Sequence, residues 1–343
     1  MKKRPKQRPI RVLVECNERL GPARDGFWGF TTEYPVDGGE DLMYPISIRE
    51  LARCKIKYTS PALPDGVSAK IWNKVPDRVK AKLFTIWLRV GRVPESVLES
   101  RTIFLPKKEE TVLPSDTRPI SISSVVLRHF HKLLTGRLSE LVEPKLDSKQ
   151  CGFRPRDGIA FCISQLDRVL TDTRNEKRGL CLVSLDLCKA FDSISHQAIF
   201  YTLESMGLDK KFISYLRYVY GNGRTRLTYG GEESAPILPG RGVRQGDPLS
   251  PLIFNVVFDN VLRSVPDQLG LRCRGEWVSK LAFADDLVLC AENAVDLQHV
   301  LDMAMPVVRA CGLKVNEQKS VSLTWLACGK DKRRIYDHRP TLN

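Results

Sequence analysis

Two adjacent carboxylates, Asp285 and Asp286, stand between the apolar residues 281–284 and 287–290. Neighbouring acids repel each other, so they add nothing to folding unless a cation lies between them. Carboxylate oxygens are hard ligands, and magnesium is a divalent ion that suits them. A solvated turn is the alternative interpretation of the pair taken alone. Further ligands elsewhere in the chain must therefore decide between the two.

Asp186 supplies a third acid at the end of the apolar residues 180–185, which have the character of a buried central strand. If that strand and the acid pair are neighbours in one sheet, three carboxylates meet at one edge. Such a set, with two Mg²⁺ ions about 3.5–4 Å apart, forms a clamp for in-line displacement at phosphorus. One ion lowers the pKa of an attacking 3′-hydroxyl, and the other neutralises the leaving pyrophosphate. Mn²⁺ is the expected substitute.

Two basic side chains suit the triphosphate of such a substrate. Lys107 follows a strand expected at residues 101–106, and Arg118 stands just before Pro119. Arginine binds phosphate oxygens through two N–H groups, whereas lysine acts as a point charge. Lys108 remains an alternative to Lys107. A glycine-rich loop with two arginines, residues 240–249, leads into a helix capped by Ser250.

The elements expected from residue 180 onward supply a scaffold for the acids. Their order is a strand to Asp186, a helix ending near Gly207, hairpin strands over residues 216–238, a helix after Ser250, the hairpin tipped by residues 284–286, a helix over 294–311, and one or two strands over 313–325. Helices packed against an antiparallel sheet make this an α+β pattern. The preceding half is mainly helical and basic, with helices expected over residues 76–91, 120–142 and 158–173.

The charge balance indicates a polyanionic partner. The 343 residues contain 54 Lys+Arg and 40 Asp+Glu, a formal charge of +14, and nucleic acid is the commonest polyanion. The ten cysteines lack zinc-ligand spacing, which is typical of reduced thiols in an intracellular protein. No apolar run has the length of a membrane span. The basic residues 2–8 fit a nuclear signal, an arm that binds nucleic acid, or a disordered tail. We therefore expect an intracellular, nuclear protein that does not enter membranes.

Seven short segments occur in an order that resembles the reverse transcriptases of non-LTR (LINE-type) retrotransposons. The resemblance is closest to the site-specific clade that carries a restriction-like endonuclease, and it covers residues 60–325. Two of the segments are Leu185-Asp186-Leu187-Cys188-Lys189-Ala190-Phe191-Asp192-Ser193 and Gly242-Val243-Arg244-Gln245-Gly246-Asp247-Pro248-Leu249-Ser250-Pro251, and the runs 189–193 and 245–251 within them are the most specific. The others are Ile103-Phe104-Leu105-Pro106-Lys107, Arg118-Pro119-Ile120-Ser121, Gln150-Cys151-Gly152-Phe153-Arg154, Phe283-Ala284-Asp285-Asp286 and Gly312-Leu313-Lys314-Val315-Asn316-Glu317-Gln318-Lys319-Ser320.

The resemblance implies a right-hand polymerase fold of the α+β class. Helical fingers would precede a palm with an antiparallel sheet and packed helices of the RRM or ferredoxin-like kind. The expected division is an N-terminal extension (1–58), fingers (59–179), palm (180–326) and a basic C-terminal tail (327–343). We expect neither a primer-grip strand nor a thumb after Trp325. Because a thumb holds the duplex, its absence predicts weak or absent processive synthesis.

The resemblance also implies catalytic roles. Asp186 and Asp285 would be the principal metal ligands, with Asp286 as the third acid. The Leu187 carbonyl would face a metal as well. Lys319 matches a lysine that protonates the leaving pyrophosphate, although a solvated lysine at a strand end is an equal alternative.

Five residues would bind the incoming nucleotide. Arg118 matches the fingers arginine that contacts the triphosphate, with Lys107 beside it. Phe191 matches a sugar gate, whose ring leaves no room for a 2′-hydroxyl and so selects deoxynucleotides. Gln245 and Gly246 would lie against the nucleotide and template.

Two functions remain open. The first is an RNA-directed DNA polymerase that uses dNTPs and an RNA template and extends the 3′-hydroxyl of a nicked DNA target. The second is a nucleic-acid-binding remnant of such an element that is catalytically silent. The wording Lys189-Ala190-Phe191-Asp192-Ser193 argues against a group-II-intron or telomerase-like relative.

Overall fold

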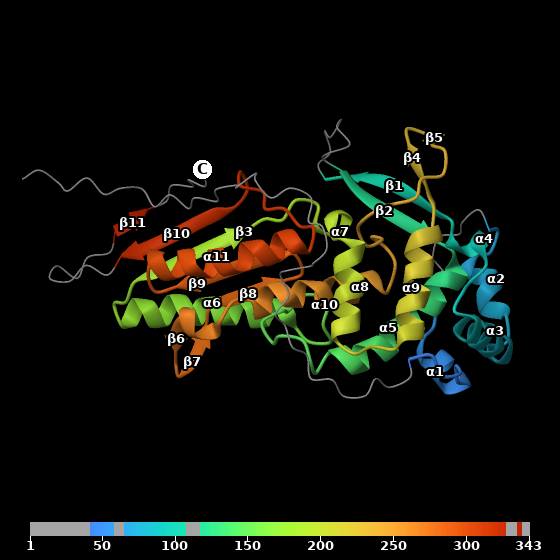
Figure 1. Ribbon diagram of the computed structural model, residues 1–343, viewed down its shortest axis with the longest axis horizontal. Coiled ribbons are helices and arrows are strands. Elements are labelled where there is room, and N and C mark those ends of the chain that lie inside the picture. Colours follow the sequence, from blue (N-terminus) through green and yellow to red (C-terminus); the bar gives the residue numbers. More distant parts are fainter. Residues whose placement is uncertain (1–41, 58–64, 108–116, 327–334, 338–343) are drawn as a thin grey trace, which may run out of the picture. The chain divides into compact units, whose positions relative to one another are not determined.

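A computed structural model describes residues 42–57, 65–107, 117–326 and 335–337 (Figure 1). Lys108, most of the expected N-terminal extension and most of the expected tail lie outside these residues. Two compact units alternate along the chain. We call them the first unit, which contains residues 147–190 and 258 onward, and the second unit, which contains residues 33–146 and 191–257.

The first unit is built on a five-stranded sheet in the order β11-β10-β3-β9-β8, in which every neighbouring pair is antiparallel. The strands are β3 (Leu180–Leu185), β8 (Lys280–Phe283), β9 (Asp286–Ala291), β10 (Val321–Leu326) and β11 (Ile335–Asp337). β3 is central and buried at all but one position, as its apolar run predicts. β11 is a strand that the sequence interpretation did not anticipate, because it lies in the segment expected to be a basic tail.

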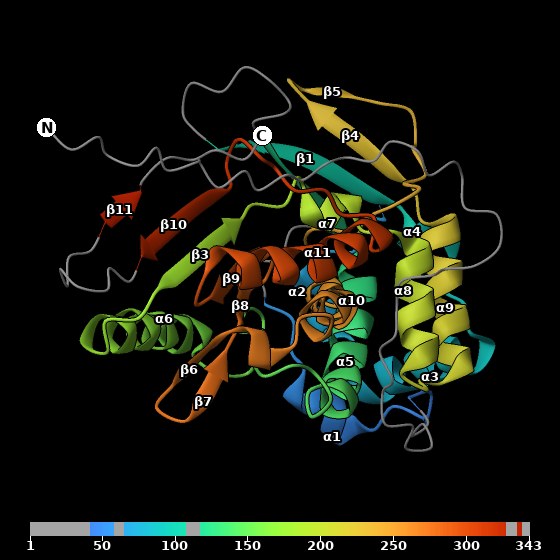
Figure 2. The ribbon, with the colours of Figure 1, turned by 60° about the vertical axis from the view of Figure 1, so that its left-hand side comes forward.

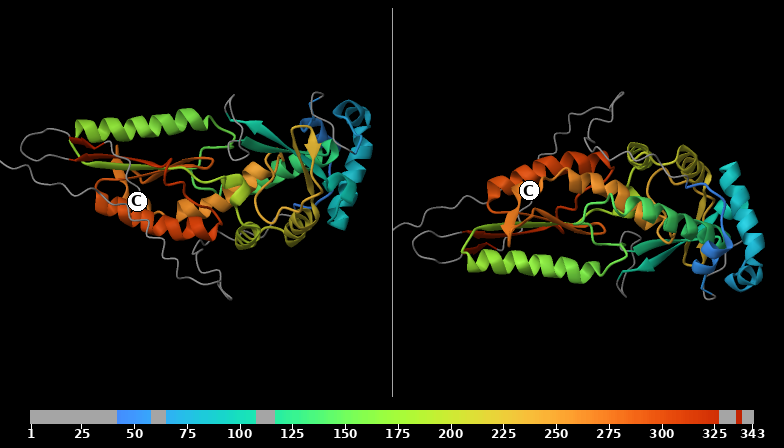
Figure 3. Two further views of the ribbon diagram at one scale, coloured as in Figure 1. Left: turned by 90° about the horizontal axis from the view of Figure 1, so that it is seen from above. Right: turned by 90° about the horizontal axis from the view of Figure 1, so that it is seen from below.

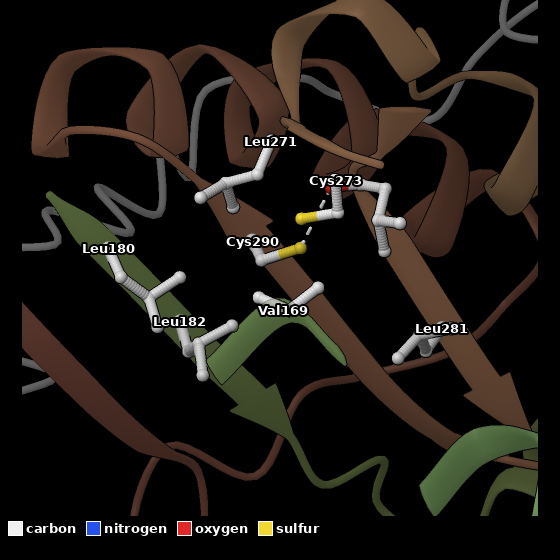
Figure 4. Packing of buried hydrophobic residues seen from close by; sticks show 8 residues of the cluster. Val169, Leu180, Leu182, Leu271, Cys273, Leu281 and Cys290 are labelled. Atoms are coloured by element: carbon white, nitrogen blue, oxygen red, sulfur yellow. Dashed lines mark hydrogen bonds between the residues drawn. The ribbon is translucent and has the colours of Figure 1, made fainter. Parts of the chain in front are cut away.

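Helices cover both faces of this sheet. Figure 3 shows α6 (Gly158–Asn175) on one face and α11 (Ala294–Ala310) on the other. A short hairpin of β6 (Leu271–Cys273) and β7 (Glu276–Val278), preceded by the 3₁₀ turn η2 (Asp267–Leu269), packs against α6. Apolar residues of the sheet, α6 and the hairpin form one core cluster (Figure 4), which comprises Val169, Leu180, Leu182, Leu271, Cys273, Val278, Leu281 and Cys290.

The second unit contains a smaller sheet in the order β2-β1-β4-β5. Its strands are β1 (Ser100–Pro106), β2 (Thr117–Ser123), β4 (Thr225–Tyr229) and β5 (Glu232–Glu233). β1 pairs antiparallel with β2 and parallel with β4. The helices are α1 (Ile48–Arg53), α2 (Ala69–Lys74), α3 (Asp77–Val90), α4 (Glu95–Leu98), α5 (Val125–Val142), α8 (His196–Ser205) and α9 (Lys210–Asn222). α8 and α9 lie side by side (Figure 2).

Two helices contain boundaries between the units. α7 (Ala190–Ser193) starts at the end of one first-unit segment, and α10 (Ser250–Arg263) passes from the second unit to the first after Val257. Among the described residues, none of the helices has both the length and the apolar character needed to cross a membrane.

Aromatic side chains form the core between α2, α3 and α5. Phe84 lies 5.2 Å from Phe130 and 5.4 Å from Trp87 between ring centroids, and Trp72 lies 5.9 Å from Phe84. The Trp72 indole N–H donates to His129 Nδ1 at 2.9 Å, so the polar atom of this buried ring is satisfied. Such rings account for much of the burial that stabilises a helical subdomain.

Two expected elements were wrong in detail. Residues 117–123 form β2, and the helix begins only at Val125, after its N-cap Ser124. The alternation Ile120-Ser121-Ile122-Ser123 has the period of a strand, which accounts for the extended conformation. Residues 216–222 belong to α9 and not to a hairpin, because Leu216 and Val219 continue the buried helical stripe of Phe212 and Ile213.

The predicted α+β class is confirmed, and so is the hairpin that carries the acid pair. The division into fingers and palm stays a prediction, since it is defined by function and the compact units interleave along the chain.

Candidate active site

The three predicted acids lie at one edge of the first unit's sheet. Leu185 of β3 pairs with Leu287 of β9, so Asp186 follows β3 at the point where Asp286 begins β9. Phe283 pairs with Asp286, which leaves Ala284 and Asp285 as a two-residue turn. Ala284 has a positive φ of 57°, as tight hairpin turns require. The antiparallel pairing thus brings together carboxylates that are about a hundred residues apart in the sequence.

Electrostatic repulsion between these acids changes the pKa of Asp286. Partial burial and the charge of Asp186 both raise the pKa of the Asp286 carboxyl above its ordinary value. Within the described residues, no three His, Cys, Asp or Glu side chains already converge as a metal-binding group. Two carboxylates that repel each other across an antiparallel pair are nevertheless a donor set that a divalent cation would stabilise. Asp186 and Asp286 therefore fit part of a divalent-ion site, and the place of the turn residue Asp285 in it stays a prediction.

The backbone of Asp186 is held by the segment that precedes β10. The Asp186 N–H donates to Ser320 Oγ at 3.1 Å, and the Asp186 carbonyl accepts from the Asn316 N–H at 2.7 Å. The Cys188 N–H donates to the Lys314 carbonyl at 2.7 Å. These bonds flank an isolated antiparallel bridge between Leu187 and Val315. The metal-facing role of the Leu187 carbonyl stays a prediction.

Lys319 belongs to the same segment. Its N–H donates to the Asn316 carbonyl at 3.2 Å, and its side chain is exposed. Since Asn316 also bonds Asp186, the turn that carries Lys319 is tied to the acid edge of the sheet. Its role in proton transfer stays a prediction.

Gln150 holds the acid turn in a way that sequence reasoning missed. Its Nε2 donates to the Ala284 carbonyl at 3.1 Å, and its Oε1 accepts from the Ala284 N–H at 3.0 Å. Oε1 also accepts from the Gly152 N–H at 3.0 Å. Backbone bonds from Cys151 to Ala282, 2.8 Å, and from Ala282 to Lys149, 3.0 Å, extend the contact along β8.

Gly152 completes this clamp. A Cβ on this residue would collide with the Ala284 backbone nitrogen, so only glycine permits the close approach. Gln150 and Gly152 belong to one of the segments that carry the family resemblance. That membership was the only sequence signal for them, and it assigned them no role.

The predicted nucleotide-binding residues all belong to the second unit. The Phe191 ring stacks on Phe254, with centroids 4.5 Å apart and planes 9° from parallel. The Val243 N–H donates to the Phe191 carbonyl at 2.7 Å. The gate candidate is therefore held from two sides, by a buried ring and by the glycine-rich loop. Its role as a gate stays a prediction.

Gln245 and Gly246 lie in that loop, beside β2. Gln245 Nε2 donates to Asp192 Oδ1 at 2.9 Å, and the Gln245 carbonyl accepts from the Ser121 N–H at 2.7 Å. Gly246 has a φ of 112°, and a Cβ there would collide with the Ser121 carbonyl. A cavity of about 230 Å³ is lined by Ser121, Asp192, Gln245 and the neighbouring Arg241. The loop thus presents an amide and a guanidinium to a space of molecular size.

A buried network behind the loop was also missed. His131 Nδ1 lies 2.6 Å from Asp247 Oδ2, and His131 Nε2 lies 2.7 Å from the Tyr215 hydroxyl. Burial alone would raise the pKa of the Asp247 carboxyl, but the interactions with His131, the Leu249 N–H and Arg244 together lower it. The Leu249 N–H adds a 2.9 Å bond to Asp247. Asp247 therefore anchors the residues that directly follow Gln245 and Gly246.

Lys107 and Arg118 occupy one end of the β1–β2 ladder. Arg118 pairs with Leu105, and Lys107 follows Pro106, the last residue of β1. Both side chains are exposed, so their charges are available to a phosphate. The structure brings this pair together, whereas Lys108 lies outside the described residues.

Comparisons with known proteins agree with the motifs. The family profile described as "Reverse transcriptase (RNA-dependent DNA polymerase)" matches residues 105–335. The chain is 38% identical over 305 residues to the "Retrovirus-related Pol polyprotein from type-1 retrotransposable element R2" of Nasonia vitripennis, covering 88% of this chain. It is 37% identical over 280 residues to the corresponding polyprotein from type-2 element R2DM of Drosophila melanogaster, covering 82% of this chain.

The chain spans 29% and 26% of the lengths of these two relatives. Among solved structures, it is similar to apo telomerase from Candida tropicalis truncated from its C-terminal domain. That similarity has a TM-score of 0.49 and 14% sequence identity, and it covers 78% of this chain and 58% of the telomerase.

Proposed function

The chain belongs to the reverse transcriptase (RNA-dependent DNA polymerase) family, and on this premise we propose that it is the polymerase domain of a non-LTR retrotransposon. The observation that carries the proposal is the meeting of Asp186 and Asp286 at one end of an antiparallel strand pair, where partial burial and the charge of Asp186 raise the pKa of the Asp286 carboxyl. Folding alone does not explain two repelling acids at this position, whereas a divalent-metal site does.

The acids would bind two Mg²⁺ ions, for which Mn²⁺ is a substitute, together with the Leu187 carbonyl. When bound, the ions would activate the primer 3′-hydroxyl and neutralise the leaving pyrophosphate. Lys319 would donate a proton to the pyrophosphate oxygen. The bonds from Ser320 and Asn316 to Asp186 support the proposal, because they restrict the backbone on which the first ligand stands.

The second unit would bind the incoming dNTP. Arg118 and Lys107 would contact triphosphate oxygens, which suits their exposed position at one hairpin end. The ring of Phe191 would exclude a 2′-hydroxyl, and its stacking on Phe254 restrains it from moving aside. Gln245 and Gly246 would lie against the nucleotide and template on a loop anchored by Asp247.

The proposed partners are an RNA template and a DNA primer at a nicked target, which would place the protein in the nucleus. The named R2 elements among its relatives and the net charge of +14 support this proposal. Because the chain covers less than a third of those relatives, the reaction of a complete element is part of the proposal as well.

Primer extension on an RNA template with Mg²⁺ and dNTPs tests the polymerase. Asp285→Ala should lower the extension rate by more than about 100-fold, since loss of an outer-shell partner alone costs about 10–100-fold at metal sites. Asp302→Asn is a matched control, because Asp302 is an exposed acid on α11 of the same unit, and it should leave the rate unchanged.

Extension that survives Asp285→Ala would refute the assigned site. If the wild type does not extend a primer but binds RNA in a salt-sensitive manner, the chain is the catalytically silent remnant instead.

A further inference from the structure

The β6–β7 hairpin presents an aromatic and basic outer face that polymerisation chemistry does not use. Its register pairs Leu271 with Val278 and Arg272 with Trp277. Leu271 and Val278 are fully buried in the core cluster. Since side chains alternate between the two faces of a strand, Arg272 and Trp277 point away from that core. Both are exposed, and Trp277 retains 38% of its accessible surface.

The turn of the hairpin holds an arginine where few residues fit. Cys273 pairs with Glu276, so Arg274 and Gly275 form a two-residue turn in which both φ angles are positive, 47° and 88°. Turns of this type favour Asn-Gly, Asp-Gly or Gly-Gly, and arginine in this conformation costs free energy. Strain of this kind accumulates at binding and catalytic sites. The Arg274 side chain at the tip of the hairpin is 70% exposed.

Arginines of α6 and of the segment that follows it hold the hairpin in place. Arg168 Nη1 lies 2.8 Å from Glu276 Oε2, and its Nη2 donates to the Cys273 carbonyl. Arg178 Nη2 donates to the Arg272 carbonyl at 2.8 Å. These two arginines contact the backbone and edge of the hairpin and do not cover its outer face.

The nearby acids are already paired. Glu276 pairs with Arg168, Glu176 with Arg178, and Asp172 with Arg274 at 3.3 Å. In the described part of the chain, the Arg272 guanidinium and the Trp277 ring take part in no ion pair or ring contact. The charge of Arg272 is therefore unopposed beside an exposed indole.

We propose that the outer face of this hairpin binds single-stranded nucleic acid. A base would stack on the Trp277 indole while its cross-strand neighbour Arg272 contacts a flanking phosphate. An aromatic platform beside a guanidinium group is the chemistry that single-strand binders use, and it accepts any base because every base has a π-face. A membrane or an apolar protein partner would favour several exposed apolar side chains, whereas this face combines one ring with arginines.

This site is distinct from the acid edge. β8 connects Val278 with the acid turn, and its four residues separate the hairpin from the turn by about 13 Å. Binding at the hairpin therefore needs neither a metal ion nor a nucleotide, and the inference does not depend on the proposed polymerase activity. The site would hold a strand away from the catalytic edge.

Fluorescence anisotropy of a labelled 12-nucleotide single strand, measured with the full chain in EDTA, tests the proposal. Trp277→Ala should weaken binding by about 5- to 100-fold, because a stacked base contributes that much to affinity. Trp277→Phe should retain most of the affinity, since the smaller ring still stacks. Arg272→Glu should weaken binding and reduce the salt slope by about one or more.

The control is Arg309→Glu, which makes the same change of charge at an exposed arginine on α11 of the same unit. It should affect binding much less than Arg272→Glu. All the variants change exposed side chains, and thermal unfolding checks that they fold. If Trp277→Ala proves unstable, the affinities of Trp277→Phe and Arg272→Glu are compared instead.

RNA and DNA oligomers of one sequence and a duplex form the arms of the experiment. Preference for single-stranded RNA or single-stranded DNA, or equal affinity for both, supports the site and shows which nucleic acid it binds. Wild-type affinity in Trp277→Ala or Arg272→Glu would overturn the proposal. Equal losses in Arg309→Glu and Arg272→Glu, or a preference for the duplex, would overturn it too.

Discussion

Replacing Gln150 should loosen the acid turn, because one amide makes three hydrogen bonds there. Two of them satisfy the N–H and carbonyl of Ala284, which is 6% exposed, and the third satisfies the Gly152 N–H. Gln150→Met fills a similar volume with no hydrogen-bonding group. The substitution therefore separates the hydrogen bonds from the packing of the side chain.

The structure permits an estimate of the loss. A net hydrogen bond contributes about 1 kcal/mol, and a buried backbone group left without a partner costs about 1–3 kcal/mol. With Ala284 already in a left-handed conformation, its turn has little stability of its own. We expect Gln150→Met to lower the free energy of unfolding by about 3 kcal/mol, which corresponds to a decrease in Tm of about 6–12 °C.

Denaturant unfolding and primer extension provide the measurements. The extension rate should fall and the Mg²⁺ concentration for half-maximal rate should rise, because Asp285 follows Ala284 directly and would lose its fixed position. Template affinity should stay unchanged. Gln150→Glu is the matched variant, because its Oε1 can still accept from Ala284 and Gly152 but faces the Ala284 carbonyl without a donor, and it should be intermediate. A Gln150→Met protein with wild-type stability and wild-type Mg²⁺ dependence would refute the reasoning.

Three further predictions concern the same two units. Without metal, Asp286→Asn should stabilise the protein at neutral pH. The fold raises the pKa of Asp286 above 3.8, so the native state binds more protons than the unfolded state. Wild-type stability therefore falls as pH rises through that window. Thermal unfolding in EDTA should show the gain vanishing at acid pH, and saturating Mg²⁺ should reverse the order; a gain that is independent of pH would contradict this cause. Lys280→Ala should lower the free energy of unfolding by about 3 kcal/mol, because the Lys280 side chain is only 4% exposed and lies 3.1 Å from Asp147 and 3.3 Å from Asp267. Urea denaturation measures this free energy, and an unchanged value would show that the two ion pairs add nothing to stability. Phe191→Val should admit ribonucleotides in extension assays, and unchanged discrimination between dNTP and NTP would exclude the gate.

Much of the site's scaffold is visible in local sequence. The apolar residues 180–185 predict a buried strand because only a central strand removes both faces from water. Asp285 and Asp286 between two apolar runs predict a hairpin tip, and the structure places them there. Both patterns need only neighbouring residues, so periodicity is sufficient to detect them.

Contacts between residues far apart in the chain cannot be predicted from the periodicity of apolar residues. Nothing local in Gln150 indicates that its amide bonds Ala284, 134 residues away, or that His131 pairs with Asp247, 116 residues away. Local signals also misplaced the start of α5 and assigned part of α9 to strands, because short apolar runs fit either period until packing decides.

The sequence by itself determined the chemistry of this protein: its acids, its basic loop, the order of its motifs and its positive charge. Only the tertiary structure decided how those acids are held. Antiparallel pairing of β3 with β9 brings Asp186 to Asp286, and the bonds from Gln150, Asn316 and Ser320 restrain the backbone on either side. The physical reason is that carboxylates are recognisable by type, whereas their distance depends on strand register and on hydrogen bonds between segments that are far apart in the chain.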